Sequence, residues 1–326
     1  MNFKYITVVL FLFFSFCLQA QDSLKKFAIN RTASAPKIDG DLTDAIWQTA
    51  SPYTDFVQNR PIEGAQPSQK TEVRMMYDDY GIYVSAMLYD NHADSILHEL
   101  GFKDDEGLNA DKFDIRIDPY NTRQDAFIFG VYASGVQYDN KFSDWTFNAV
   151  WQSAVKITDK GWCVEMLIPY MAIRFPNVQV QTWAVQFTRD IRRHREFIQW
   201  SLTPSKVAVG AKLWGNLVGI NNIKPPLRLS LTPYLTFYAE RSPFYYSSSN
   251  YVFTNQMRLL YGADLKYGLN ESFTIDMTLL PDFSQVQSDN KIRNLTYREI
   301  NYDENRPFFK EGTVKQSHLI SENIIR

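Results

Sequence analysis

The fold class of this chain is indicated first by residues 71–89, TEVRMMYDDYGIYVSAMLY. Two runs rich in β-branched, aromatic and other apolar residues, 71–77 and 82–89, flank the turn Asp78-Asp79-Tyr80-Gly81. Such runs favour strands, and a segment rich in Asp and Gly between them is typical of a tight connection. The stretch therefore predicts a β-hairpin.

Similar short runs recur along the chain and are separated by turn signals. Further strands are expected at 112–117, 126–132, 153–158, 161–168, 182–189 and 196–201. Helix-like periodicity is scarce, and short helical turns are expected only around 43–49 and 170–175. Many short strands at this spacing predict an all-β fold, an antiparallel β-sandwich over residues 24–223.

Composition supports β structure and excludes some partners. The chain has 23 Phe, 19 Tyr and 7 Trp, and aromatic residues are enriched in strands. Its net charge is −2 without a run of like charges, which argues against a nucleic-acid partner and against a polybasic membrane anchor.

The first twenty residues have the pattern of a secretory signal peptide. Lys4 precedes an apolar run at 6–18, and Leu18-Gln19-Ala20 offers a cleavage site. The run is too short to span a membrane stably. We therefore expect an exported chain that retains one cysteine, Cys163, and depends on its core rather than on an internal disulfide.

A second part begins after Lys224-Pro225-Pro226, where two prolines cannot donate to a strand ladder. Apolar and polar residues then alternate strictly in 227–239, 257–267 and 273–279. This pattern is typical of outer-membrane barrel strands and also of a soluble sheet with one wet face. Three strands cannot close a barrel, which needs about eight. Residues 227–326 therefore predict either a soluble sheet or the first part of an incomplete barrel.

No catalytic motif is evident, and no metal site or cofactor is expected. Signatures of zinc proteases, of nucleophile elbows and of phosphate loops do not occur in the sequence. Asp111, Asp114 and Glu165 would suit glycoside hydrolysis if two of them came ~5 to ~9 Å apart. We expect no enzyme, with a glycan-directed hydrolase of carbohydrate catabolism as the alternative.

Two charged stretches have structural interpretations. Asp39, Asp41 and Asp44 lack the pattern of a calcium loop, and we interpret them as a turn followed by an N-capped helical turn, with Trp47 packed against a sheet. The arginines of 189–195 lie between two strands. A solvated hairpin tip is favoured there over an anion site.

Trp145 and Trp151 are candidate ligand-binding residues. They flank Asn148 in an aromatic segment, and aromatic faces stack on the apolar C–H faces of sugar rings. Core packing is the alternative for each ring.

Several motifs resemble family 9 carbohydrate-binding modules, in the order of that family and over residues 30–223. They are Ile38-Asp39-Gly40 to Trp47, the hairpin around 77–83, the strand 111–118, GWCVEMLIP at 161–169 and WGNL at 214–217. The resemblance implies a β-sandwich related to DOMON-type sensor domains and, as partner, a poly- or oligosaccharide.

The resemblance also implies positions for the sugar site. The family holds a sugar between two tryptophans, while an acidic residue and an arginine contact its hydroxyls. The acidic position falls at Asp114, the arginine near Gly130, and the tryptophans near Leu108 and near Val209 or Gly210. Since three of these four groups differ, we expect this chain not to bind sugar in that mode. Asp114, Trp145 and Trp151 are the candidate ligand residues.

The second part has its own resemblance. GADLKYG at 262–268, PDFSQV at 281–286 and NRPFFKEG at 305–312 resemble the domain of unknown function 5916. That domain usually follows a family 9-like module in secreted proteins of Bacteroidetes and looks like an outer-membrane barrel, in chains that continue further. The resemblance implies a truncated chain whose sandwich is attached to the outer membrane. A partner-binding domain that binds no sugar is the alternative.

Overall fold

The computed structural model describes residues 24–280 except 106, 145–146, 208–209, 228, 248–249 and 270–272. The expected signal peptide, Trp145 and the motifs at 281–286 and 305–312 lie outside the described residues. The strands are β1 (Lys26–Ala28), β2 (Asn30–Arg31), β3 (Val57–Arg60), β4 (Thr71–Tyr77), β5 (Gly81–Tyr89), β6 (Lys112–Asp118), β7 (Phe127–Tyr132), β8 (Gln137–Lys141), β9 (Gln152–Thr158), β10 (Gly161–Pro169), β11 (Val180–Ile191), β12 (Glu196–Gln199), β13 (Gly215–Asn221), β14 (Leu229–Ser247), β15 (Asn250–Gly268) and β16 (Thr274–Leu279).

Four short 3-10 helices accompany these strands: η1 (Ala45–Thr49), η2 (Ala93–Ser95), η3 (Arg192–His194) and η4 (Gly210–Leu213). Among the described residues, no helix is long and apolar enough to cross a membrane.

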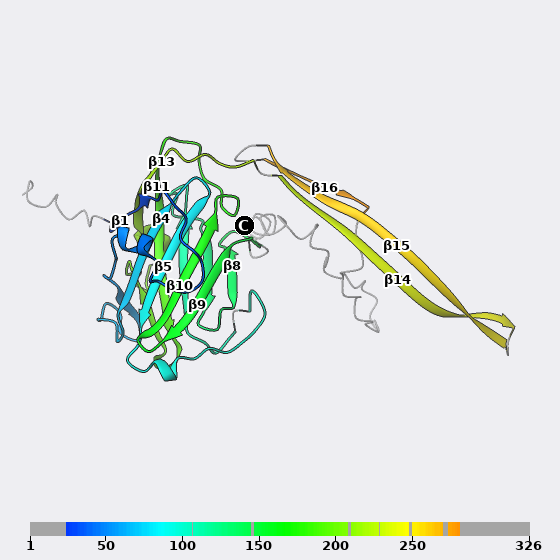
Figure 1. Cartoon of the computed structure of the whole chain (residues 1–326), viewed down its shortest axis with the longest axis horizontal. Helices are drawn as coiled ribbons and strands as arrows, with labels where there is room; N and C mark the ends of the chain where they lie inside the picture. The colour runs from blue at the N-terminus through cyan, green and yellow to red at the C-terminus, as the bar shows by residue number, and fades with distance from the viewer. Residues whose placement is uncertain are drawn as a thin grey trace, which may run out of the picture.

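Two sheets form the sandwich (Figure 1). Sheet A has the order β1-β13-β11-β6-β7-β8, with β12 paired to β11 and β3 paired to β12. Sheet B has the order β2-β4-β5-β10-β9. The N-terminal segment joins both sheets, because β1 pairs with β13 in sheet A and β2 pairs with β4 in sheet B.

The predicted hairpin is confirmed. β4 and β5 are antiparallel, with Thr71 opposite Leu88 and Tyr77 opposite Ile82. The other expected strands of the sandwich are also present, although β12 ends at Gln199 rather than at Ser201. Sequence analysis missed β1, β2, β3, β8 and β13. Most of these are short or polar segments, so their strand signal is weak.

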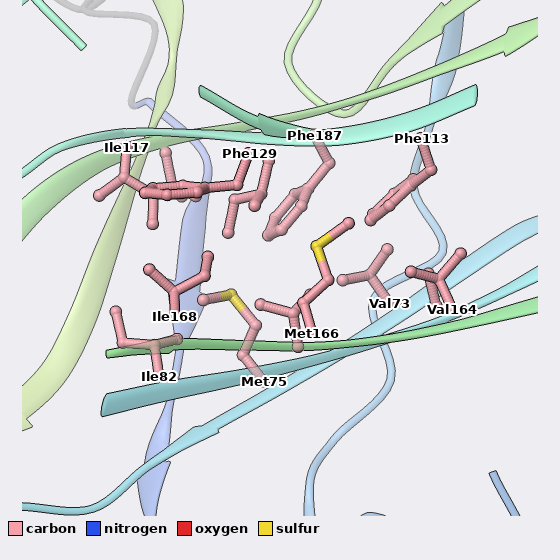
Figure 2. Packing of buried hydrophobic residues seen from close by; sticks show 14 of the residues in the cluster. Val73, Met75, Ile82, Phe113, Ile117, Phe129, Val164, Met166, Ile168 and Phe187 are labelled. Atoms are coloured by element: carbon pink, nitrogen blue, oxygen red, sulfur yellow. The ribbon is translucent and has the colours of Figure 1, made fainter. Parts of the chain in front are cut away.

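One large apolar core lies between the sheets (Figure 2). Alternate residues of β6 face it, namely Phe113, Ile115 and Ile117, each fully buried. The opposite side is lined by Val73 and Met75 of β4 and by residues of β5 and β10. Since side chains alternate between faces along a strand, the even-numbered residues of β6 point away from this core.

The helical turn η1 covers the outer face of sheet B. Trp47 is 0 % exposed and packs with Met76, Tyr83 and Leu167, as predicted. Its indole Nε1 donates to Glu165 Oε1 at 2.7 Å.

Asp39 and Asp41 shape the turn before η1, because their carboxylates accept the backbone N–H of the residue two positions on. Asp44 occupies the predicted N-cap position of η1, but the expected side-chain cap is absent. Its side chain makes no capping hydrogen bond and accepts the N–H of Lys37 instead.

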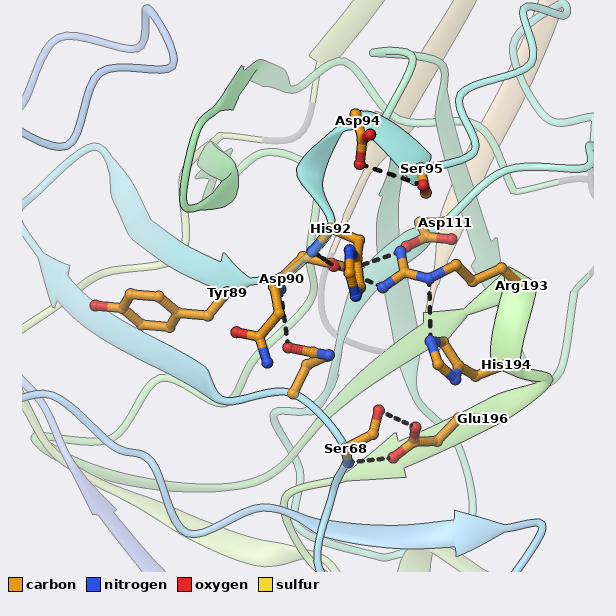
Figure 3. Close-up of polar contacts among 12 residues, drawn as sticks. Ser68, Tyr89, Asp90, His92, Asp94, Ser95, Asp111, Arg193, His194 and Glu196 are labelled. Carbon is orange, nitrogen blue, oxygen red and sulfur yellow. Dashed lines mark hydrogen bonds and ion pairs between the residues drawn. The ribbon is translucent and has the colours of Figure 1, made fainter.

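Two arginines, one near the end of β11 and one in the connection to β12, bond to residues of or next to sheet B. Arg189 of β11 is fully buried and donates to the carbonyl oxygens of Lys70, just before β4, and of Tyr89, at the end of β5. Burial lowers the pKa of Arg189 to about 10. Arg193 forms a two-bond ion pair with Asp90 (Figure 3). The expected solvated tip is therefore wrong for Arg189, which ties sheet A to sheet B.

The last described strands form a separate open sheet of order β14-β15-β16. The cross-strand register places Leu235 opposite Tyr261, and Leu265 opposite Met277. The predicted alternation is confirmed, and it gathers apolar side chains on one face of this sheet and most of the polar ones on the other. The apolar side chains are well exposed, for example Leu235 at 70 %.

Candidate functional site

The strands of sheet A direct most of their polar side chains away from the core, to the outer face of the sheet. We call it the polar face, and its residues are Lys112, Asp114 and Arg116 of β6, Tyr138 of β8, Gln186, Thr188 and Asp190 of β11, and Phe197 and Gln199 of β12. Register aligns them in rungs: Asp190 lies between Lys112 and Phe197, and Thr188 lies between Asp114 and Gln199. Strands lie about 5 Å apart, so a rung across three of them is about 10 Å wide.

Asp114 is the buried centre of this face. It is 1 % exposed, and its carboxylate accepts hydrogen bonds from Thr188 Oγ1 at 2.6 Å, Tyr138 Oη at 2.9 Å and Arg116 Nε at 2.8 Å. Burial by itself disfavours the carboxylate, but the Arg116 guanidinium and these donors hold the pKa of Asp114 below its ordinary value. Asp114 is therefore an ionised group that positions its neighbours.

Tyr138 occupies the space that Gly130 leaves on β7. A Cβ at Gly130 would clash with Cζ of Tyr138, and the Tyr138 ring also packs against Leu108 and Tyr132. Three positions that the family resemblance assigned to sugar contact, Leu108, Asp114 and Gly130, thus come together around one tyrosine. The fourth position was placed near Val209 or Gly210: Val209 lies outside the described residues, and Gly210 is the first residue of η4.

Trp151 lies in the main core rather than on the surface. It is 5 % exposed, packs edge-on against Phe129 and donates Nε1–H to Asp139. The ligand roles of Asp114 and Trp151 stay predictions, and their burial leads us to base the site on other residues.

Unused hydrogen-bonding capacity on the polar face lies beside Asp114. Arg116, with a quarter of its side chain exposed, directs Nε and Nη2 to Asp114 and leaves Nη1 for another partner. Gln199, only 7 % exposed, accepts the N–H of Thr203 through Oε1, and its amide N–H groups have no partner among the described residues. Asp190 is half-buried, and burial raises its pKa. Sequence analysis missed Arg116 and Gln199. The alternation of KFDIRID is a signal that places Arg116 on the face opposite Phe113, whereas its grouping with Gln199 depends on the register of β11 and β12.

Phe197 adds an apolar surface to this face. Its ring is partly exposed, and the Arg60 guanidinium lies 5.0 Å from its centroid. The site therefore combines one ring, a cationic donor, an amide and a carboxylate. This set suits a neutral, hydroxyl-rich molecule, which needs both donors and acceptors.

The three carboxylates considered for hydrolysis lie on different faces of the two sheets. Asp114 lies on the outer face of sheet A and Glu165 on the outer face of sheet B. Both sheets therefore separate the two carboxylates, and packed sheets are themselves about 10 Å apart. Asp111 is two positions before the core-facing Phe113 and so lies on the same side of the sheet, and its Oδ1 accepts the N–H of Arg192. Among the described residues, no group of three or more His, Cys, Asp or Glu side chains could hold a metal ion.

Each of the two parts of the chain matches a known protein family. The family model "Carbohydrate family 9 binding domain-like" matches residues 38–220, and "Domain of unknown function (DUF5916)" matches residues 225–316. No curated protein matches the chain.

Two solved structures of a carbohydrate-binding module of family 9 from Caldicellulosiruptor kristjanssonii are similar to it. The complex with glucose has a TM-score of 0.45 and 17% identity, and covers 62% of this chain and 100% of its own. The complex with cellotriose has a TM-score of 0.43 and 16% identity, with the same coverage. Since the first family model spans more than half of the sequence, the chain belongs to the carbohydrate family 9 binding domain-like family.

Proposed function

We propose that residues 38–220 form a saccharide-binding module that catalyses no reaction. We further propose that the chain is exported by residues 1–20 and is attached to the outer membrane through β14–β16. Membership of the family and the polar face around Arg116 support the saccharide, because that face presents free donors and acceptors beside an aromatic ring.

Each group on the polar face has a proposed role. Arg116 Nη1 and the Gln199 amide donate to sugar hydroxyls, Asp190 accepts from them, and the Phe197 ring contacts an apolar C–H face. Asp114 is a positioning residue, since it fixes the Arg116 guanidinium. Trp145 stays a candidate second platform.

The non-catalytic assignment is supported by the separation of the carboxylates. Glycoside hydrolysis needs two carboxyl groups about 5 to 9.5 Å apart on either side of the scissile bond. Asp114 and Glu165 lie on opposite outer faces of the sandwich, and Asp114 is already used by three donors.

The membrane attachment is supported by what we call the apolar band of the three-stranded sheet. Its members are Leu229, Leu231, Pro233, Leu235, Phe237 and Ala239 of β14, Met257, Leu259, Tyr261, Ala263, Leu265 and Tyr267 of β15, and Ile275, Met277 and Leu279 of β16. The band contains no charged residue, while the opposite face holds Asp264, Lys266 and Asp276. Strands that separate lipid from a polar interior have this arrangement.

Binding to a glycan array by the whole chain in detergent tests the saccharide function. We expect retention on at least one glycan, and we expect the Gln199→Ala and Phe197→Ala variants to lose it at least tenfold. Lys156→Ala, an exposed change on sheet B, is the matched control. If the unsubstituted chain binds no glycan, the alternative of a partner-binding domain replaces this proposal.

A further inference from the structure

We propose that the sandwich faces the periplasm and that the far end of the β14–β15 hairpin projects from the cell surface. This inference rests on the proposed attachment to the outer membrane, and it adds the direction in which the chain crosses.

The apolar band matches one crossing of a bilayer. It extends over 229–239 in β14 and over 257–267 in β15. A tilted transmembrane strand needs about 9–11 residues, so these segments are long enough to cross once.

The far limit of the band is marked by Arg241 and Asn255. These residues are paired across the two strands and lie on the same face as the band, so a charge and an amide interrupt the apolar face there, and the pairs that follow on this face, Pro243 with Phe253 and Tyr245 with Tyr251, are rich in aromatic residues. The Arg241 guanidinium lies 4.5 Å from the centroid of the Phe253 ring. Aromatic and basic side chains are typical of the membrane–water interface.

The hairpin continues well beyond this limit. β14 and β15 have 19 residues each, and the ladder runs on to the pair Ser247 and Asn250. At about 3.4 Å per residue, residues 240–247 extend about 25 Å past the apolar band.

The near end has no such extension. Leu229 and Tyr267 form a pair and both belong to the band, and Gly268 is the last residue of β15. The connection to β16 is short and is closed by a hydrogen bond from Leu269 N–H to the carbonyl oxygen of Phe273. The sandwich joins β14 at this same end (Figure 1).

This asymmetry sets the direction. Bacterial outer-membrane barrels have short turns on the periplasmic side and longer loops outside the cell. The short β15–β16 connection is therefore periplasmic, and so is the sandwich that precedes β14. Its saccharide must be one that is present in the periplasm, rather than a polymer restricted to the cell surface.

Cysteine labelling of whole cells tests the direction. Two variants of the whole gene product are made in a Gram-negative host. Ser242→Cys introduces a cysteine beyond the apolar band, and Asp159→Cys introduces one in the exposed β9–β10 turn. A maleimide that cannot cross the outer membrane is added before or after permeabilisation. The unsubstituted chain, whose Cys163 is buried, sets the background. Digestion of the unsubstituted chain by added protease is a second measurement that needs no substitution.

We expect Ser242→Cys to react in intact cells and Asp159→Cys to react at least tenfold less until the membrane is opened. Protease should likewise spare the sandwich in intact cells. Labelling of Asp159→Cys in intact cells, or protection of Ser242→Cys in a chain found in the outer membrane, overturns the direction alone. A chain that fractionates as a soluble protein refutes the attachment, and the direction with it.

Discussion

Trp47 Nε1 donates a 2.7 Å hydrogen bond to Glu165 Oε1 on the outer face of sheet B. The other carboxylate oxygen of Glu165 accepts the backbone N–H groups of Asp39 and Gly40. One buried glutamate thus anchors both the turn at Asp39-Gly40 and the Trp47 side chain to sheet B. Burial raises the pKa of Glu165 even though these three donors favour its charged form.

Replacement of Glu165 should loosen this segment. Glu165→Leu leaves two buried donors and one partly buried donor without an acceptor and should lower the free energy of unfolding by about 3–5 kcal/mol. Glu165→Gln keeps one acceptor oxygen and should lower it by about 1–3 kcal/mol. Urea unfolding followed by tryptophan fluorescence measures both, with Glu63→Gln on the surface as the control. Equal losses in the two variants would show that the hydrogen bonds are not what holds the segment.

The packing of Tyr138 on Gly130 predicts a strong coupling between them. Gly130→Ala should destabilise the chain by about 2 kcal/mol, because the added Cβ meets the tyrosine ring. In a Tyr138→Ala background the same change should have little effect. A double-mutant cycle by chemical denaturation should give a coupling of at least about 1 kcal/mol. Additive effects would contradict the contact.

Asp111 should make stability depend on pH. Burial raises its pKa to about 6 from an ordinary value of 3.8, and its Oδ2 is buried without a hydrogen-bond partner among the described residues. Between about pH 4 and pH 6 the folded chain therefore keeps a proton that the unfolded chain has released. This contribution to stability is present below about pH 4 and is lost as the pH rises to 6.

Asp111→Asn removes that ionisation. The variant should be more stable than the unsubstituted chain at pH 7, by about 1–3 kcal/mol, and similar to it at pH 4. Urea unfolding at the two pH values measures the difference, and Asp159→Asn in the exposed turn should change neither value. A variant that is less stable at pH 7 would mean that the Asp111 carboxylate is a net stabilising group.

A charge in the apolar band should block membrane assembly. Leu235→Lys places an ammonium group at mid-band, where a lipid-facing lysine costs about 2–4 kcal/mol. Thr232→Lys puts the same group on the opposite face and should be tolerated. The amount of chain in the outer-membrane fraction distinguishes them. Equal amounts would indicate that the band does not face lipid.

Sequence by itself determined most of the strands, though not β1, β2, β3, β8 and β13, and the faces of their side chains. The alternation in TEVRMMY, in KFDIRID and in the segments after Pro226 has a period of two, and a strand exposes such a pattern as one apolar and one polar face. The hairpin of β4 and β5, the sandwich and the apolar band follow from this local property. The family motifs added the type of sandwich.

Tertiary structure decided which groups meet. Glu165 and Trp47 are 118 positions apart, Asp114 and Thr188 are 74 apart, and Arg189 contacts a carbonyl 119 positions away. No local pattern encodes such pairs, because they depend on which strands become neighbours and in what register. Trp151 was a candidate ligand platform, and its contacts with Phe129 of β7 and Asp139 of β8 place it in the core. Asp114 stays on the outer face of sheet A, where Tyr138 and Thr188 from other strands bury it. Arg116, Gln199 and Phe197 became a candidate site only once β6, β11 and β12 were side by side.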